Sequence, residues 1–129
     1  MTDMSDWRRR IDEIDRKLVQ LLNERSHCAL EIGKIKQERN LPLYQPDRER
    51  EVIKNAQSQN PGPLSDAAIR RLFERIIDEA RSAERANPGP LTDAAIRRLF
   101  ERIIDEARAA ERNAMHPDGA KEKRPKEGT

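Results

Sequence analysis

Apolar residues recur along the first forty positions at steps that alternate between four and three, which is the spacing of one face of an α-helix. The segment from Asp6 to about Arg39 contains no proline and one glycine. It is therefore predicted to form one unbroken helix, with Ser5 or Asp6 as its N-cap. The apolar seam of this helix consists of Trp7, Ile11, Ile14, Leu18, Leu21, Cys28, Ile32 and Ile35.

Two shorter helices are predicted after two proline-containing breaks. Residues 40–46 include two prolines, and Pro46 suits the first turn of a helix that runs to about Gln57. Residues 60–63, Asn-Pro-Gly-Pro, form the second break. Ser65 or Asp66 can cap a third helix that ends near residue 85. The apolar stripe of this third helix contains Ile69, Leu72, Phe73, Ile76, Ile77 and Ala80.

The third helix and its leader are then repeated. Residues 60–86 return as residues 87–113, and only three of the 27 positions differ. We interpret residues 4–86 as one domain and residues 87–113 as a tandem duplicate of its third helix. The polar residues 114–129 are predicted to be a disordered tail.

The length of the first helix predicts a dimer. A helix of about 34 residues is roughly 50 Å long, whereas a compact domain of this size has a radius of gyration of about 13 Å. The apolar seam nevertheless continues from Trp7 to Ile35, so its ends need cover from outside the chain. An intertwined homodimer is the simplest arrangement. A coiled-coil dimer without further function is the alternative.

Composition agrees with an all-α protein and excludes several functions. Charged residues make up 39% of the chain and aromatic residues 3%, which suits amphipathic helices around a thin core. The net charge of +2 predicts neither a nucleic-acid nor a membrane partner. A lone cysteine, Cys28, excludes a disulfide within the chain, and no residues have metal-ligand spacing. An N-terminus without an apolar leader suggests the cytoplasm.

Several charged residues occupy positions on the buried sides of the predicted helices. Arg25 lies in the seam of the first helix, and Lys36 follows eleven residues later on the same face. Glu49, beside Arg48, borders the inner face of the second helix, and Glu84 lies on the stripe of the third. Buried charges are costly without partners. Structural ion pairs are one explanation, and a pocket for a small polyanion is the other.

Four segments of the sequence resemble the all-helical chorismate mutases over about residues 4–86: WRRRIDEID from Trp7, LLNER from Leu21, EIGKIK from Glu31 and PLYQPDRE from Pro42. The resemblance implies an intertwined dimer of three-helix chains. It also implies rearrangement of the dianion chorismate to prephenate by an intramolecular [3,3] shift, in the shikimate pathway of aromatic amino-acid biosynthesis. No cofactor and no metal are implied.

The resemblance also implies roles for individual residues. Arg8 would reach into the partner's site to hold a substrate carboxylate, and Arg25 would hold a carboxylate within its own chain. Lys36 would bind the other carboxylate and the ether oxygen. Arg48 would help to order the pocket, and Glu49 would accept a hydrogen bond from the ring hydroxyl.

On the third helix, Glu84 would lie over the ether oxygen, where a glutamine can occur in the family. Gln45 stands where an aspartate can occur, and Ala80 where a serine can occur; both changes would weaken polar contacts to substrate. Glu111 is the repeat's counterpart of Glu84. Because the connection to the second copy is about 27 residues longer, loop closure favours docking of the first copy by about 1.3 kcal/mol. The second copy would keep an unpaired apolar stripe.

Two other functions remain open from the sequence. An isochorismate-pyruvate lyase uses a similar scaffold on a similar dianion, although Glu49 and the full-length loop before it favour the mutase. A helical regulatory module that binds without turnover is the alternative from another class, and the duplicated helix is the reason to keep it.

Overall fold

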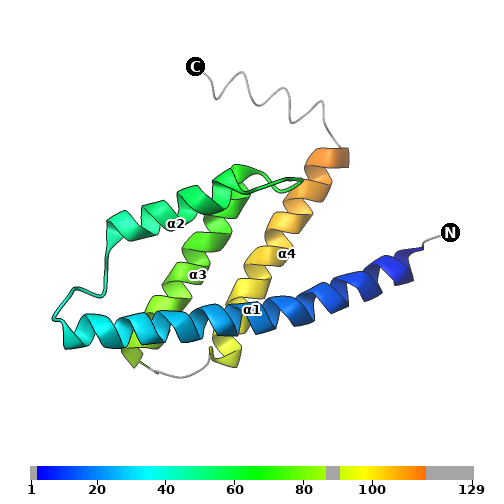
Figure 1. Ribbon diagram of the computed structural model, residues 1–129. Coiled ribbons are helices and arrows are strands. Elements are labelled where there is room, and N and C mark those ends of the chain that lie inside the picture. Colours follow the sequence, from blue (N-terminus) through cyan, green and yellow to red (C-terminus); the bar gives the residue numbers. More distant parts are fainter. Residues whose placement is uncertain (1–2, 87–90, 116–129) are drawn as a thin grey trace, which may run out of the picture. The chain divides into compact units, whose positions relative to one another are not determined.

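The structure, a computed structural model, describes residues 3–86 and 91–115, and the side chains of 3–83 and 91–114. Over these residues the chain forms four α-helices and no strand (Figure 1): α1 (Met4–Glu38), α2 (Pro46–Ser58), α3 (Asp66–Ala86) and α4 (Asp93–Met115). The all-α prediction is confirmed. Residues 87–90, and the predicted tail from residue 116 onward, lie outside the described residues.

The N-cap of α1 lies two or three residues earlier than the sequence predicts. Asp3 is the N-cap: its Oδ1 accepts a hydrogen bond from the backbone N–H of Asp6 at 3.1 Å, and the Asp6 carboxylate accepts from the N–H of Asp3 at 3.3 Å. This reciprocal pair satisfies two N–H groups that a helix start leaves without partners. Neither predicted cap, Ser5 or Asp6, holds that position, because an aspartate three residues earlier can add a turn.

The other helix starts agree with the sequence. Pro46 is the first residue of α2. The Ser65 hydroxyl accepts from the N–H of Ala68 at 3.1 Å before α3. Thr92 makes the equivalent 3.1 Å bond before α4, accepting from Ala95. The repeat therefore carries its own helix-capping signal in each copy.

The chain divides into two compact units. The first unit contains α1, the following loop to Gln45, the end of α3 from Asp78, and residues up to Ile96 at the start of α4. In this unit, the Asn23 side chain accepts a hydrogen bond from the N–H of Leu91 at 3.3 Å and donates to the Val19 carbonyl at 3.0 Å. Leu91, which lies just before α4, is thus attached to the middle of α1.

The apolar seam of α1 remains largely exposed in this unit. The buried residues of α1 are Leu22 and Ser26, and neither belongs to the seam. On a helical projection Leu22 lies about 100° and Ser26 about 140° from Leu21, although Leu22 lies only about 40° from Leu18. The exposed seam residues are Trp7, Ile11, Ile14, Leu21, Cys28, Ile32 and Ile35. Within this unit, the buried face of α1 is therefore displaced from the centre of the predicted apolar seam.

The second unit contains α2, α3 up to Ile77, and α4 from Arg97. Here α3 and α4 lie side by side and run in opposite directions (Figure 1). Arg71 donates two hydrogen bonds to the Glu106 carboxylate, at 2.6 and 2.7 Å. Arg102 lies 3.8 Å from the same carboxylate. Hydrogen bonding from Arg71 lowers the pKa of Glu106 below its ordinary value, although burial opposes the shift.

The sequence predicts that the apolar stripe of the second repeat has no packing partner. This prediction is wrong in part. Leu99 is only 3% exposed, whereas Ile104 is 47% exposed. Ala95, Leu99 and Glu106 are all buried, and their spacing of four and seven puts them on one helical face. This face is offset from the centre of the predicted stripe. The sequence pattern missed it because a charged residue such as Glu106 is normally assigned to the solvent side of a helix. The stripe residues that stay half-buried are Ile96, Phe100 and Ile103.

We expect Glu106→Gln to reduce the free energy of unfolding by about 1–3 kcal/mol at neutral pH, because it removes the negative charge and replaces one of the two acceptor oxygens by an NH2 group. Since the folded pKa of Glu106 is lowered, its stabilisation is present above the ordinary glutamate pKa and is lost as pH falls through the lower, folded value. Urea unfolding from neutral pH to about pH 3 should show the two proteins converging at acid pH.

Glu101→Gln is the matched control, since Glu101 is an exposed glutamate of the same helix. It should follow the wild type at every pH. A constant difference between wild type and Glu106→Gln across the acid range would contradict the assignment of the stabilising charge.

Candidate active site

Lys36 lies where the end of α1 meets the loop that follows it. Its side chain is half-buried, and its Nζ donates to the backbone carbonyl of Leu43 at 3.1 Å. Asn40 adopts a positive φ of 56°, a conformation that asparagine tolerates better than most residues. The N–H of Leu41 then donates to the Lys36 carbonyl at 2.8 Å. The loop therefore folds back over the last turn of α1 and fixes the ammonium group.

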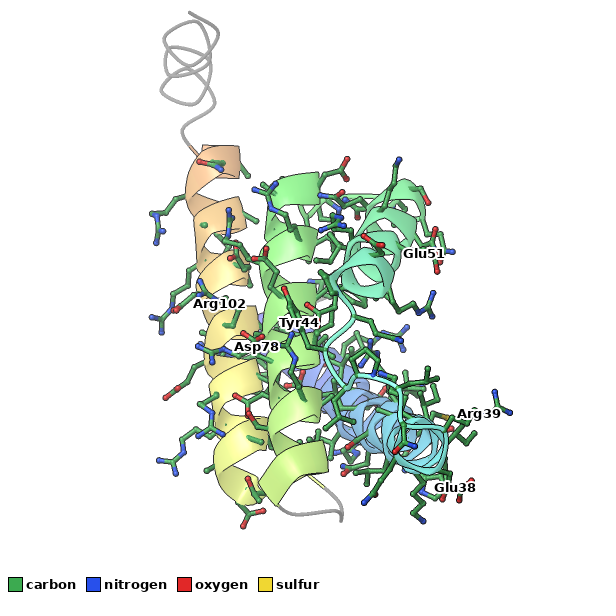
Figure 2. The ribbon with its side chains drawn as sticks, turned by 90° about the vertical axis from the view of Figure 1, so that its left-hand side faces the viewer. Glu38, Arg39, Tyr44, Glu51, Asp78 and Arg102 are labelled. Atoms are coloured by element: carbon green, nitrogen blue, oxygen red, sulfur yellow. The ribbon has the colours of Figure 1, made fainter. Side chains whose placement is uncertain are left out.

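The same loop is attached to α3 through an aromatic contact. The Arg81 guanidinium lies over the Tyr44 ring, 4.8 Å from its centroid, and 3.7 Å from the Asp78 carboxylate. Figure 2 shows Tyr44 and Asp78 together against α3. Gln45 is half-buried beside Tyr44, and Ala80, which precedes Arg81, is buried. Lys36, Gln45 and Ala80 are thus brought into one region of the first unit.

The two arginines of α1 are placed differently. Arg25 is half-buried, at the border between the buried and the exposed face of the helix. It lies on the same side as Lys36, about 16 Å away along the helix axis. Arg8 is exposed and lies about 26 Å from Arg25 along the same straight axis. Arg8 and Arg25 of one chain therefore do not share a site for a small ligand.

Arg48 and Glu49 belong to the second unit. Arg48 is exposed and forms an ion pair with Glu51, one turn further along α2. Glu49 is half-buried. The local pairing of Arg48 was not predicted from the sequence, although its i, i+3 spacing is a known signal for such a pair.

The third-helix candidates are described unequally. Glu84 belongs to the helical part of α3, but its side chain lies outside the described residues. Its counterpart Glu111 is exposed on α4. The predicted role of either carboxylate in a site stays a prediction.

Metal binding and membrane crossing find no support in the described part of the chain. Its residues contain no group of three or more His, Cys, Asp or Glu side chains that could hold a metal ion. None of the helices in that part of the chain combines the length and the apolar composition needed to cross a membrane.

Sequence reasoning missed the residues that attach the loop and the repeat. Tyr44 and Arg81 are 37 positions apart, and Asn23 and Leu91 are 68 apart. Spacing within a helix or a turn therefore cannot predict either contact. The available signal was weak: Tyr44 is the chain's only tyrosine, and it lies in a proline-bounded loop beside a candidate site residue.

Comparison with known proteins connects this geometry to a family. A family model for chorismate mutase type II matches residues 7–85. A bifunctional chorismate mutase/prephenate dehydratase of Aquifex aeolicus is 35% identical over 86 residues, which are 64% of this chain and 24% of that protein. A chorismate mutase of Methanocaldococcus jannaschii is 35% identical over 49 residues, which are 38% of this chain and 50% of that protein.

A solved structure supports the same connection. The form II structure of chorismate mutase from Thermus thermophilus aligns with a TM-score of 0.63 and 34% identity, over 65% of this chain and 96% of that one. The chain thus has the all-helical fold of that enzyme. Since the family model matches well over half of its residues, the chain belongs to the chorismate mutase type II family. It spans 24% or less of the bifunctional relatives that it matches, and the family match ends before the second repeat.

We expect Tyr44→Leu to loosen the loop that fixes Lys36. An arginine–aromatic contact at a partly exposed site contributes about 0.5–1 kcal/mol, so local opening should increase about two- to fivefold. Hydrogen exchange of the Leu41 amide measures this opening, because that N–H is bonded to the Lys36 carbonyl.

Tyr44→Phe is the control, because it keeps an aromatic face for Arg81 and should exchange like the wild type. If the Leu and Phe variants exchange at the same rate, the ring does not hold the loop.

Proposed function

We propose that this chain is a chorismate mutase, which rearranges chorismate to prephenate within the active site of a homodimer in the cytoplasm. The observation that carries the proposal is the pair of half-buried cations on one side of α1, Arg25 and Lys36, in a chain whose residues 7–85 match the family. A dicarboxylate is the class of ligand that two such cations can hold at its two ends.

The reaction is intramolecular, so the protein has two tasks. It holds the flexible dianion in a compact reactive conformer, for which Arg25 and the partner's Arg8 are the proposed carboxylate clamps. It also supplies donors to the ether oxygen, where negative charge develops as the C–O bond breaks. Lys36 suits this second task because its ammonium has three N–H donors, and the Leu43 carbonyl accepts only one of them.

The remaining candidates complete the pocket in this proposal. Glu49 accepts a hydrogen bond from the ring hydroxyl, and Arg48 helps to order the site. Gln45 and Ala80, which stand where the family can have an aspartate and a serine, would weaken polar contacts to the substrate. Glu84, when protonated, donates a second hydrogen bond to the ether oxygen, which makes the reaction dependent on its protonation state.

The homodimer is supported by two features of α1. Its seam from Trp7 to Ile35 is exposed in the single chain, and an uncovered apolar stripe of that length favours association. In addition, Arg8 lies too far from Arg25 to serve the same site in one chain. A two-fold partner would cover the seam and bring its own Arg8 to the pocket.

The purified chain should consume chorismate and form one prephenate for each chorismate lost, without added metal or cofactor. Parallel assays with isochorismate separate this function from the lyase, whose products would be salicylate and pyruvate. Tight binding of a transition-state analogue with no turnover of either substrate would instead support the non-catalytic regulatory module.

Arg8→Ala and Arg25→Ala should each reduce turnover by about a hundredfold or more, because each removes a cation that the dianion needs. If Arg8 serves the neighbouring chain, mixing and refolding the two variants should restore activity. Half of the randomly formed dimers are then mixed, and each carries one intact site, so about a quarter of wild-type activity should return.

Arg10→Ala is the matched control for Arg8→Ala, since Arg10 is an exposed arginine of the same region; it should remain active. Confirmed mixed dimers without recovered activity would contradict the shared site.

Glu84→Ala should abolish most activity, while Glu111→Ala should leave it near the wild-type level. The two carboxylates are repeat equivalents, but α3 follows α2 directly and its copy alone falls within the family match. Initial rates of the two variants make the comparison. Equal, partial losses would mean that the two copies exchange in the site.

A further inference from the structure

The two copies of the repeat share two buried positions. Ala68 in α3 and its equivalent Ala95 in α4 are both buried, and the equivalent glutamates Glu79 and Glu106 are each 5% exposed. A buried glutamate is uncommon unless it is paired. Both copies therefore use a face that is offset from the centre of the predicted apolar stripe, and Leu72 and Leu99 belong to the stripe and to this face alike.

This face carries opposite charges at its two ends. In α4, Arg98 precedes Glu106 by eight residues, and in α3 the equivalent Arg71 precedes Glu79 by eight. The bidentate pair between Arg71 and Glu106 shows how the charges match when the helices run antiparallel. A surface with a cation at one end and an anion at the other complements an antiparallel copy of itself.

Each residue of this face in α4 has an identical equivalent in α3. Residues 66–85 and 93–112 differ only at Ser82 and Ala109. Leu99, which is only 3% exposed, has Leu72 as its equivalent. A second α3, presented by another molecule, would supply the same arginine, glutamate, leucine and alanine as α4 does.

We infer that the repeat face of α3, defined as Ala68, Arg71, Leu72 and Glu79, is a self-association surface for the same face of α3 in a second copy of this chain. In the full chain α4 contacts that surface through the pair between Arg71 and Glu106. Because α4 follows directly in the sequence, its effective concentration is of millimolar order, and it excludes the second copy at ordinary concentrations. The second repeat is thus an internal cap that limits assembly. This inference does not depend on the proposed enzymatic function.

The test is a charge reversal in the full chain, followed by sedimentation velocity. Glu106→Arg places an arginine against Arg71 and should release α4 from the surface. The face of α3 is unchanged in this variant, so Arg71 can pair with Glu79 of a second copy. The expected result is a particle of at least twice the wild-type mass at the same concentration, with helix content by circular dichroism maintained.

Two further variants determine which surface is responsible. Arg71→Glu combined with Glu106→Arg restores an opposite-charge pair within the chain and sets glutamate against Glu79 between chains, so the wild-type mass should return. Glu79→Arg added to Glu106→Arg removes the acceptor for the second copy, and the mass should again fall to the wild-type value. Glu101→Arg, the same charge change at an exposed site of α4, should have no effect.

An unchanged mass for a helical Glu106→Arg variant would overturn the inference. A doubled mass that persists after Glu79→Arg would also overturn it, because the association would then use another surface. If Glu106→Arg loses its helix content, the wild type and the swapped Arg71→Glu/Glu106→Arg protein are compared at about millimolar concentration. The wild type alone should gain mass there, and equal masses would contradict the inference.

Discussion

The exposed seam of α1 governs both how this protein is built and how it would work. A helix of 35 residues cannot be covered on all sides by so short a chain, and the chain covers only the face that holds Leu22 and Ser26. Arg25 lies at the border of that face, so it is partly desolvated yet open toward the seam. The length that leaves the seam uncovered also separates Arg8 from Arg25. In the proposed homodimer, the partner would cover the seam and supply its own Arg8 to the site.

The site region in the first unit depends on contacts that join distant parts of the chain. Lys36 is fixed by the loop carbonyl that it binds, and the loop is held against α3 by Tyr44 and Arg81. The second repeat adds a structural layer of its own. It is tied to α1 through Asn23 and, in the second unit, contacts α3 through the ion pair between the exposed Arg71 and the buried Glu106. The second repeat lies outside the residues that match the family.

The sequence predicted the all-helical fold and the family, and both are confirmed. Helix starts at Pro46 and after Ser65 were also correct, because proline and serine signals act within one turn. The first N-cap was wrong because an earlier aspartate, Asp3, can extend the helix. The face by which α4 packs was missed because periodicity treats Glu106 as a solvent residue, whereas its burial depends on an arginine 35 positions away. The assigned site roles stay predictions, since they depend on substrate and partner.

If a second chain completes the mutase site, activity must depend on dimer formation, and dilution measures that dependence. Specific activity toward chorismate is measured across a dilution series, while the fraction of dimer is measured at the same concentrations by sedimentation equilibrium. We predict that specific activity falls in proportion to the dimer fraction. A monomer with the full specific activity of the dimer would contradict a site shared between two chains.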